Sequence, residues 1–170
     1  MSVNRESVPE FSSPACSMHE VSDAYMGYAG KAELAAVLNE LLEAERAGSR
    51  VTLESARAAG SGPLADLLRT VQRDEARWCA MLLLQIKGLG ENPSSETGAF
   101  YAKAMAIADL GERIAFLDRG QRWVARKLRE ILPRVRDSGL HANLSDMLQS
   151  HEGNIDLVNG FEACSKASRP

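Results

Sequence analysis

A helical period of apolar residues, repeated in four long segments, is the feature that most constrains what this chain can fold into. Apolar side chains return at alternating steps of three and four residues in the segments at about 31–59, 63–87, 109–132 and 138–163. A helix with such a stripe is stable when the stripe is buried against other helices. We therefore predict an all-α fold in which four amphipathic helices form a bundle spanning residues 31–163.

Local signals mark the ends of these segments. Gly60 follows the first segment, and Pro63 stands at the first helical position of the second. Asp109 has Glu112 three residues later, which is capping-box spacing, and Pro133 lies just beyond the third segment. Because so few residues join the first two helices, we predict that they form an antiparallel hairpin.

The connection at 88–108 is much longer than the other two, and its second half has helical character. A crossover between two hairpins needs such a length, because the chain must travel roughly 35 Å along the bundle at ~1.5 Å per helical residue. An external subdomain is the alternative use of these residues. The crossover favours a ferritin-like connectivity of two antiparallel hairpins.

The first 29 residues lack a clear period and mix Ser, Pro, Glu and Gly. We interpret residues 1–29 as a flexible or loosely docked N-terminal tail. Tyr25, Met26 and Tyr28 are the side chains in it that can pack back onto the helices.

Composition and charge exclude several classes of protein. The net charge of −3 is too small for a typical nucleic-acid or membrane-surface protein. No apolar run has the length of a signal peptide or a membrane span. Cys16, Cys79 and Cys164 form no close pair and no CxxC motif, which favours a reducing compartment. We expect a cytoplasmic protein without membrane or nucleic-acid partners.

Three titratable residues occupy stripe positions where leucine is expected. Glu45 lies at the centre of the first stripe, Glu75 at the centre of the second and His151 at the centre of the fourth. Counted from the nearest turns at ~1.5 Å per residue, all three fall within a few ångströms of one height, about halfway along the bundle. The sequence therefore predicts that they meet in the core.

Burial of a lone carboxylate costs several kcal/mol unless the group is paired, protonated or bound to metal. Two carboxyl groups and an imidazole at one level can meet this cost together. One solution is a bound metal ion, and another is a protonated, hydrogen-bonded cluster.

The pattern over about residues 31–163 resembles the ferritin-like (rubrerythrin-like) superfamily. Di-iron members of that superfamily carry Glu on helix 1, Glu-x-x-His on helix 2, Glu on helix 3 and Glu-x-x-His on helix 4. By this resemblance Glu45 matches the first glutamate, Glu75 the second and His151 the last histidine. The resemblance implies a metal-binding bundle with a redox or stress-related role.

This chain departs from the superfamily pattern at three ligand positions, where it has Trp78, Leu148 and Gln121. Half of the six ligands are therefore missing. We expect at most a single ion of iron, manganese or zinc, held by Glu45, Glu75 and His151 with Asp118 or water completing the shell.

Two alternatives to metal binding remain open at the level of sequence. The three core residues can be a metal-free polar remnant, in a helical scaffold that acts by self-association or partner binding. Phe116 and Trp123 lie off the core stripe of the third helix, where they form a dimer patch or lie under the crossover with Phe100 and Tyr101. We expect a homodimer.

Arginines follow the outer side of the third helix and the turn after it, at positions Arg119, Arg122, Arg126, Arg129 and Arg136. A dock for an anionic ligand is one interpretation. A solvated face paired with acidic neighbours is the interpretation that we favour, because no aromatic residues are interleaved with the arginines.

Overall fold

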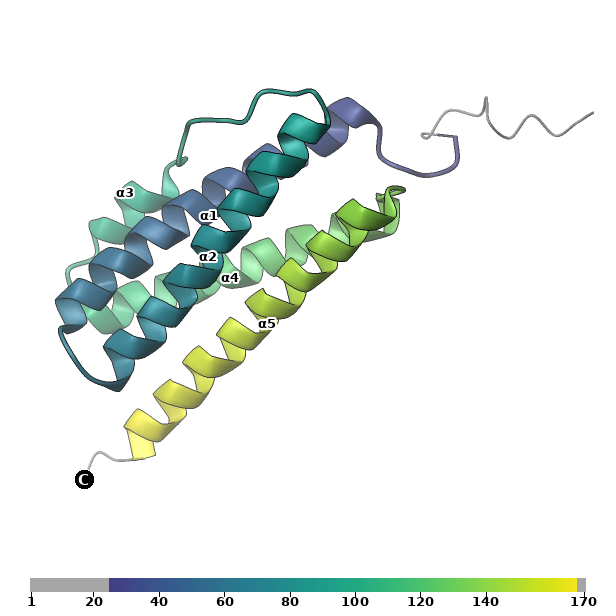
Figure 1. Ribbon diagram of the computed structural model, residues 1–170. Helices are drawn as coiled ribbons and strands as arrows, with labels where there is room; N and C mark the ends of the chain where they lie inside the picture. Colours follow the sequence, from purple (N-terminus) through teal and green to yellow (C-terminus); the bar gives the residue numbers. More distant parts are fainter. Residues whose placement is uncertain (1–24, 168–170) are drawn as a thin grey trace, which may run out of the picture.

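The computed structural model describes residues 25–167, and the helices in it account for most of the chain (Figure 1). The elements are α1 (Lys31–Ala59), α2 (Pro63–Gly88), α3 (Phe100–Met105), α4 (Leu110–Ile131), the 3-10 turn η1 (Leu132–Arg134) and α5 (Ser138–Ala167). No strand occurs between residues 25 and 167, so the all-α prediction is confirmed. The last helix runs four residues beyond the predicted end at 163, and the helical half of the crossover forms α3.

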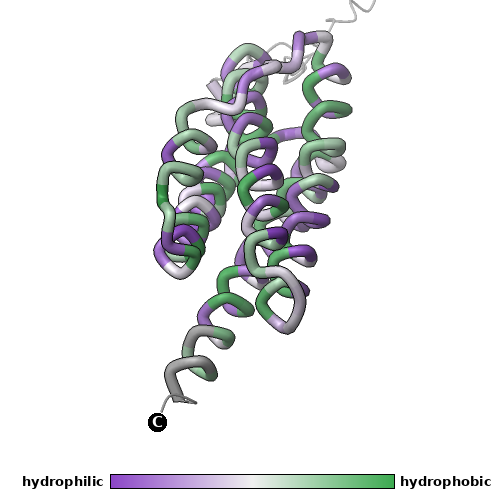
Figure 2. Tube along the Cα trace, turned by 90° about the vertical axis from the view of Figure 1, so that its left-hand side faces the viewer, coloured by the Kyte–Doolittle hydropathy of each residue, from purple (hydrophilic) through white to green (hydrophobic). Residues whose placement is uncertain are grey.

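The four long helices lie side by side in a closed order (Figure 1). Helix α1 packs on α2 and on α4, while α5 packs on α4 and on α2. Along each helix, hydrophobic and hydrophilic residues alternate within a turn or two, so that every helix has an apolar side (Figure 2). Burial of these sides stabilises the arrangement by about 25 cal/mol per Å² of apolar surface removed from water.

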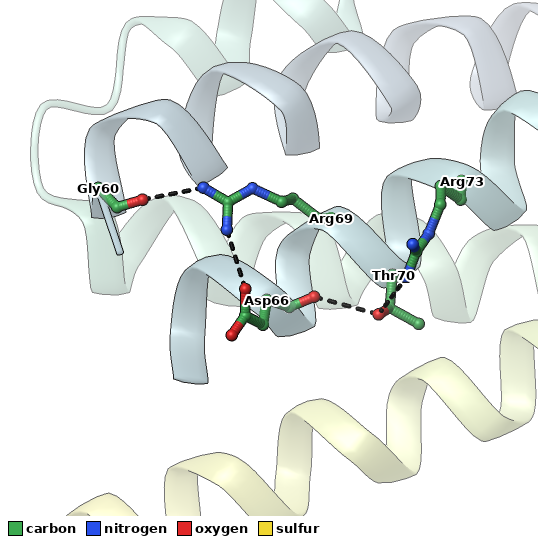
Figure 3. Close-up of polar contacts among 5 residues, drawn as sticks. All are labelled: Gly60, Asp66, Arg69, Thr70 and Arg73. Atoms are coloured by element: carbon green, nitrogen blue, oxygen red, sulfur yellow. Dashed lines mark hydrogen bonds and ion pairs between the residues drawn. The ribbon is translucent and has the colours of Figure 1, made fainter. Parts of the chain in front are cut away.

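A short turn fixes the α1–α2 hairpin. Gly60 and Gly62 have φ angles of 73° and 110°, a region that residues with a Cβ rarely adopt. Arg69 spans the turn: one guanidinium nitrogen donates to the Gly60 carbonyl oxygen and another to Asp66 Oδ1, both at 2.9 Å (Figure 3). Pro63 starts α2, as its position in the sequence predicts.

The crossover runs back along α1 from the end of α2 (Figure 1). Ser94 is its main anchor, because the Ser94 N–H donates to Asn39 Oδ1 at 2.6 Å and the Ser94 hydroxyl donates to Glu43 Oε1 at 2.5 Å. Arg46 donates to the carbonyl oxygens of Ser94 and Glu96, at 3.0 and 2.6 Å. The segment then reaches α3, which contacts both α1 and α4.

Side-chain caps begin the last two long helices. Asp109 Oδ1 accepts a hydrogen bond from the Glu112 N–H at 2.8 Å, which confirms the predicted start of the third long helix. Asp137 Oδ1 caps α5 in the same way, by accepting from the Leu140 N–H at 2.7 Å.

The apolar core is divided into two clusters along the length of the bundle. One is built around Leu38, Leu82, Leu128 and Leu144, and the other around Val51, Leu68, Ile114, Leu117 and Val158. Between them along the four long helices lie the buried polar side chains of Glu45, Glu75, Gln121 and His151.

At the N-terminal side, the structure describes only the end of the predicted tail. Tyr25 and Met26 are exposed, whereas the Ala29 N–H donates to the Arg134 carbonyl oxygen at 2.8 Å. The prediction for residues 1–24 lies outside the described residues. None of the helices between residues 25 and 167 has the length and apolarity needed to cross a membrane.

Candidate functional site

Glu45, Glu75 and His151 meet in the interior, between the two apolar clusters. Each is at most 2 % exposed, although each is titratable. The predicted burial and convergence at one height are therefore confirmed. Helices α1, α2 and α5 supply one residue each, and α4 adds the buried side chain of Gln121.

A chain of close polar contacts links these side chains. Thr52 Oγ1 lies 2.9 Å from Glu75 Oε2, and Gln121 Nε2 donates to Glu75 Oε1 at 2.7 Å. Gln121 Oε1 is 2.5 Å from His151 Nδ1, and His151 Nε2 is 3.1 Å from Glu45 Oε1. All four long helices therefore contribute to one buried network.

The amide of Gln121 determines the tautomer of His151. Because its nitrogen donates to Glu75, its oxygen is the atom that faces His151, and the hydrogen between them belongs to Nδ1. His151 Nε2 lies 3.1 Å from Glu45 Oε1, and the two groups form an ion pair only if the imidazole is protonated. His151 Nε2 and Glu45 Oε2 are buried polar atoms without a hydrogen-bond partner among the described residues.

Burial raises the pKa of Glu75 well above its usual range, and the nearby carboxylate of Glu45 raises this pKa further. The surroundings of Thr52 agree with a neutral Glu75. The Thr52 hydroxyl lies 2.8 Å from the Gly48 carbonyl oxygen as well as 2.9 Å from Glu75 Oε2, and its single hydrogen cannot serve both acceptors. A protonated Glu75 that donates to Thr52 Oγ1 leaves the Thr52 hydrogen free to bond Gly48.

Gly48 makes room for the Glu75 carboxyl group. A Cβ atom at position 48 would lie 2.9 Å from Glu75 Cδ and closer still to Oε1, which is an overlap. The missing side chain therefore allows α1 and α2 to close around the carboxyl group.

The fourth predicted metal ligand, Asp118, lies apart from this network. Its Oδ2 atom accepts from Arg122 Nε at 2.7 Å, and its Oδ1 atom is buried without a hydrogen-bond partner among the described residues. Between residues 25 and 167, no group of three His, Cys, Asp or Glu side chains is arranged to hold a metal ion. The donor types suit a metal, but both Glu75 oxygens contact Thr52 or Gln121, so the arrangement is that of the hydrogen-bonded cluster.

Positions that the superfamily pattern reserves for ligands have other contacts here. Trp78 is buried in the core with the Arg77 guanidinium 4.0 Å from its ring, and Leu148 packs on the same cluster. Next to Trp78, the half-buried Cys79 thiol has its pKa raised to about 12 by burial and by Glu45. This thiol stays protonated at neutral pH and is a poor nucleophile.

A cavity of about 430 Å³ lies beside the network, between α1, α4 and the crossover. Glu45, Glu75 and Gln121 of the network are among the residues that line it. The remaining wall is mostly apolar and includes Ala44, Phe100, Phe116, Leu117, Trp123 and Val124, with Gly48, Gly98 and Gly120. This volume and composition are those of small-molecule sites.

The crossover covers one aromatic residue of α4, Phe116. The rings of Phe100 and Phe116 stack with their centroids 4.8 Å apart, and Trp123 is half-buried in the cavity wall. Of the two interpretations of Phe116 and Trp123, cover by the crossover is confirmed for Phe116, and it stays a prediction for Trp123. The homodimer stays a prediction.

The arginines on α4 have individual partners. Arg129 pairs with Glu152 at 2.6 Å, and Arg122 pairs with Asp118. Arg119 lies over the Phe116 ring, 5.2 Å from its centroid. The favoured interpretation of a solvated, paired face is confirmed for Arg122 and Arg129. Arg119, in contrast, borders the cavity.

Gly48 and Thr52 are functional residues on the buried face of α1 that the sequence alone does not single out. One signal for them exists in the sequence. Gly48 and Thr52 follow Glu45 by three and seven residues, so all three lie on one otherwise apolar stripe. Their partner, Glu75, lies on a different helix, so only the packing of α1 on α2 connects them.

Comparisons with known proteins give one match. No curated protein and no solved structure matches the chain. A family model described as "Domain of unknown function (DUF6306)" matches residues 32–160, which include all of the residues in the buried network. The chain therefore belongs to the DUF6306 family.

Proposed function

We propose that this protein binds a small organic molecule in the cavity beneath the crossover. The proposal is supported by one observation: a mostly apolar cavity of about 430 Å³ is lined in part by Glu45 and Glu75 of the buried network. Binding sites for small molecules combine an apolar wall with a few convergent polar groups that orient the ligand.

The arrangement of the network supports this proposal. Helices α1, α2, α4 and α5 hold the polar groups in place from four directions, so the groups are preorganised. Cys79 lies nearby with a raised pKa, which argues against thiol chemistry and in favour of binding.

The test is a titration of ¹⁵N-labelled protein with the apolar probes indole and 2-phenylethanol, followed by NMR. Glycine amides resonate in a sparse part of the spectrum, and Gly48, Gly98 and Gly120 all line the cavity. We expect saturable shifts of these three amides. Ala44→Leu fills the cavity and should abolish the shifts, whereas Ala80→Leu, on an exposed position of α2, should preserve them.

The proposal fails if neither probe shifts the three glycine amides at millimolar concentration. It also fails if the shifts survive Ala44→Leu, because the probe then binds elsewhere.

A single divalent metal ion, of iron, manganese or zinc, is a second candidate occupant. Two buried atoms without partners, His151 Nε2 and Glu45 Oε2, favour it, and Gln121 holds His151 in the tautomer whose Nε2 can bind a metal. Glu75 becomes a third ligand of the metal ion only if its carboxyl group turns away from Thr52. Plasma mass spectrometry of purified protein should then find near-stoichiometric metal that His151→Ala removes, and metal-free protein of unchanged stability would exclude this candidate.

A ferritin-like relationship is a further proposal. It is supported by the path of residues 89–109, which run along α1. As a result, the C-terminal ends of α2 and α4 both lie near the start of α1. Contacts of Lys31 with Glu91, at 3.5 Å, and of Ala29 with Arg134 mark these two ends. Self-association as a homodimer, the scaffold alternative, is tested by light scattering on the eluting protein, where a monomer mass counts against it.

A further inference from the structure

We infer that the ligand of the cavity is an organic cation: a primary or secondary ammonium group attached to an aromatic or branched apolar body. This inference rests on the proposed function and names its ligand class. The ammonium group would lie at the Glu45 end, and the apolar body would lie against the aromatic rings of the crossover and α4.

The charges around the cavity favour a cation. Besides the neutral Glu75, three glutamates line the cavity, at positions 40, 43 and 45, whereas Arg119 is the single basic residue among the described residues of the wall. Glu40 is neutralised by Lys127 Nζ at 2.9 Å, and Arg119 lies over the Phe116 ring. The remaining negative groups outnumber the positive one, so an anionic head group would meet repulsion.

Glu45 provides a specific partner for an N–H donor. It is 1 % exposed and belongs to the residues that line the cavity, and its Oε2 atom has no hydrogen-bond partner within residues 25–167. A buried acceptor without a partner costs free energy that a ligand donor recovers. An ammonium group supplies several donors and a positive charge, and hydrogen bonds between charged groups are stronger than neutral ones.

The rest of the wall fits an aromatic or branched body. Phe100 and Phe116 stack on each other at one side, while Trp123, Leu117 and Val124 continue the apolar surface along α4.

The test compares three probes of similar size and different charge, by calorimetry at neutral pH and moderate salt. These probes are 2-phenylethylamine, which is cationic, 2-phenylethanol, which is neutral, and phenylacetate, which is anionic. We expect the amine to bind at least about tenfold more tightly than the alcohol, because a charge-assisted hydrogen bond replaces a neutral one. Phenylacetate should bind most weakly.

Matched variants locate the charge that matters. Glu45→Gln keeps the shape of the side chain and removes its charge, so it should lower the affinity for the amine about tenfold while leaving that for the alcohol within about twofold. Glu130→Gln removes a charge from an exposed position of α4 outside the cavity and should change neither affinity.

Two results would overturn the inference and are distinguishable from failure of the proposed function. Equal affinities for the amine and the alcohol, or tightest binding of phenylacetate, would show a cavity that binds organic molecules without preferring cations. Absence of binding by all three probes, together with unshifted glycine amides, would overturn the proposed function itself. The probe series uses the unmodified protein, so it stays decisive even if Glu45→Gln fails to fold.

Discussion

Gly48 and Glu75 occupy one space on facing turns of α1 and α2. The carboxyl group of Glu75 fills the volume that a side chain at position 48 would take. Glycine within a helix normally costs about 0.5–1 kcal/mol relative to alanine. Here that cost is offset by the room made for a buried acid and its hydrogen bonds with Thr52 and Gln121.

Gly48→Ala should lower the free energy of unfolding by about 1–3 kcal/mol, because overpacking of a buried site exceeds the gain in helix propensity. Urea denaturation followed by circular dichroism measures this. Gly153→Ala is the matched control, since Gly153 is an exposed helical glycine with nothing within 4 Å of the added Cβ, and it should stabilise by about 0.5–1 kcal/mol. A stabilising Gly48→Ala would contradict the packing described.

At the scale of elements, α3 is a short helix held by few contacts. Its first residue, Phe100, packs over Gly120 of α4, where a Cβ would lie 2.8 Å from Phe100 Cζ. Tyr101 lies beneath the Arg50 guanidinium, 4.2 Å from the ring centroid. A six-residue helix is not stable by itself, so these side-chain contacts keep the crossover over the cavity.

Gly120→Ala should therefore loosen the crossover while leaving the long helices intact. We expect faster amide hydrogen exchange in residues 97–106, measured by mass spectrometry, and little change in α2 and α5. Gly160→Ala, on α5 with open space around the added Cβ, is the control and should leave exchange in 97–106 unchanged. Unaltered exchange in Gly120→Ala would mean that Phe100 adjusts without moving α3.

At the scale of the whole molecule, a polar layer interrupts the apolar core. Leucine-rich packing lies on one side of Glu45, Glu75 and His151, and a second apolar cluster lies on the other. Buried ionisable groups seldom add to stability, because their desolvation offsets their mutual attraction. A layer that costs stability is consistent with selection for binding.

This layer makes stability depend on pH with a definite sign. The folded-state pKa of Glu75 is raised above its ordinary value of 4.5, so at this site the folded protein binds more protons than the unfolded chain above that pH. The contribution of Glu75 to stability is full below about pH 4.5 and falls as pH rises, by at most about 1.4 kcal/mol per pH unit.

Glu75→Gln resembles the protonated acid and removes this titration. The unfolding free energy of Glu75→Gln minus that of the natural protein should increase from pH 5 to pH 8, measured by urea denaturation at each pH. The other titrating groups largely cancel in the difference. A difference that is constant or that decreases with pH would contradict a raised pKa for Glu75.

Much of the site was predictable because it depends on helical periodicity. Glu45, Glu75 and His151 interrupt apolar stripes, and counting residues from the turns places them at one height. The metal ligand set was not predictable in the same way. Side-chain rotation decides whether Glu75 faces a metal or faces Thr52 and Gln121, and Asp118 lies beside the stripe, where Arg122 pairs with it.

By itself, the amino-acid sequence determined the helices, the hairpin turn at Gly60, the cap at Asp109 and the burial of the three titratable residues. Each of these depends on interactions within one helix or turn, or on the spacing of residues along a stripe. Only the tertiary structure decided which groups meet: the hydrogen-bonded order from Thr52 to His151, and the cavity beneath Phe100. Both arise from packing between segments distant in the chain, where a change of a few ångströms alters every partner.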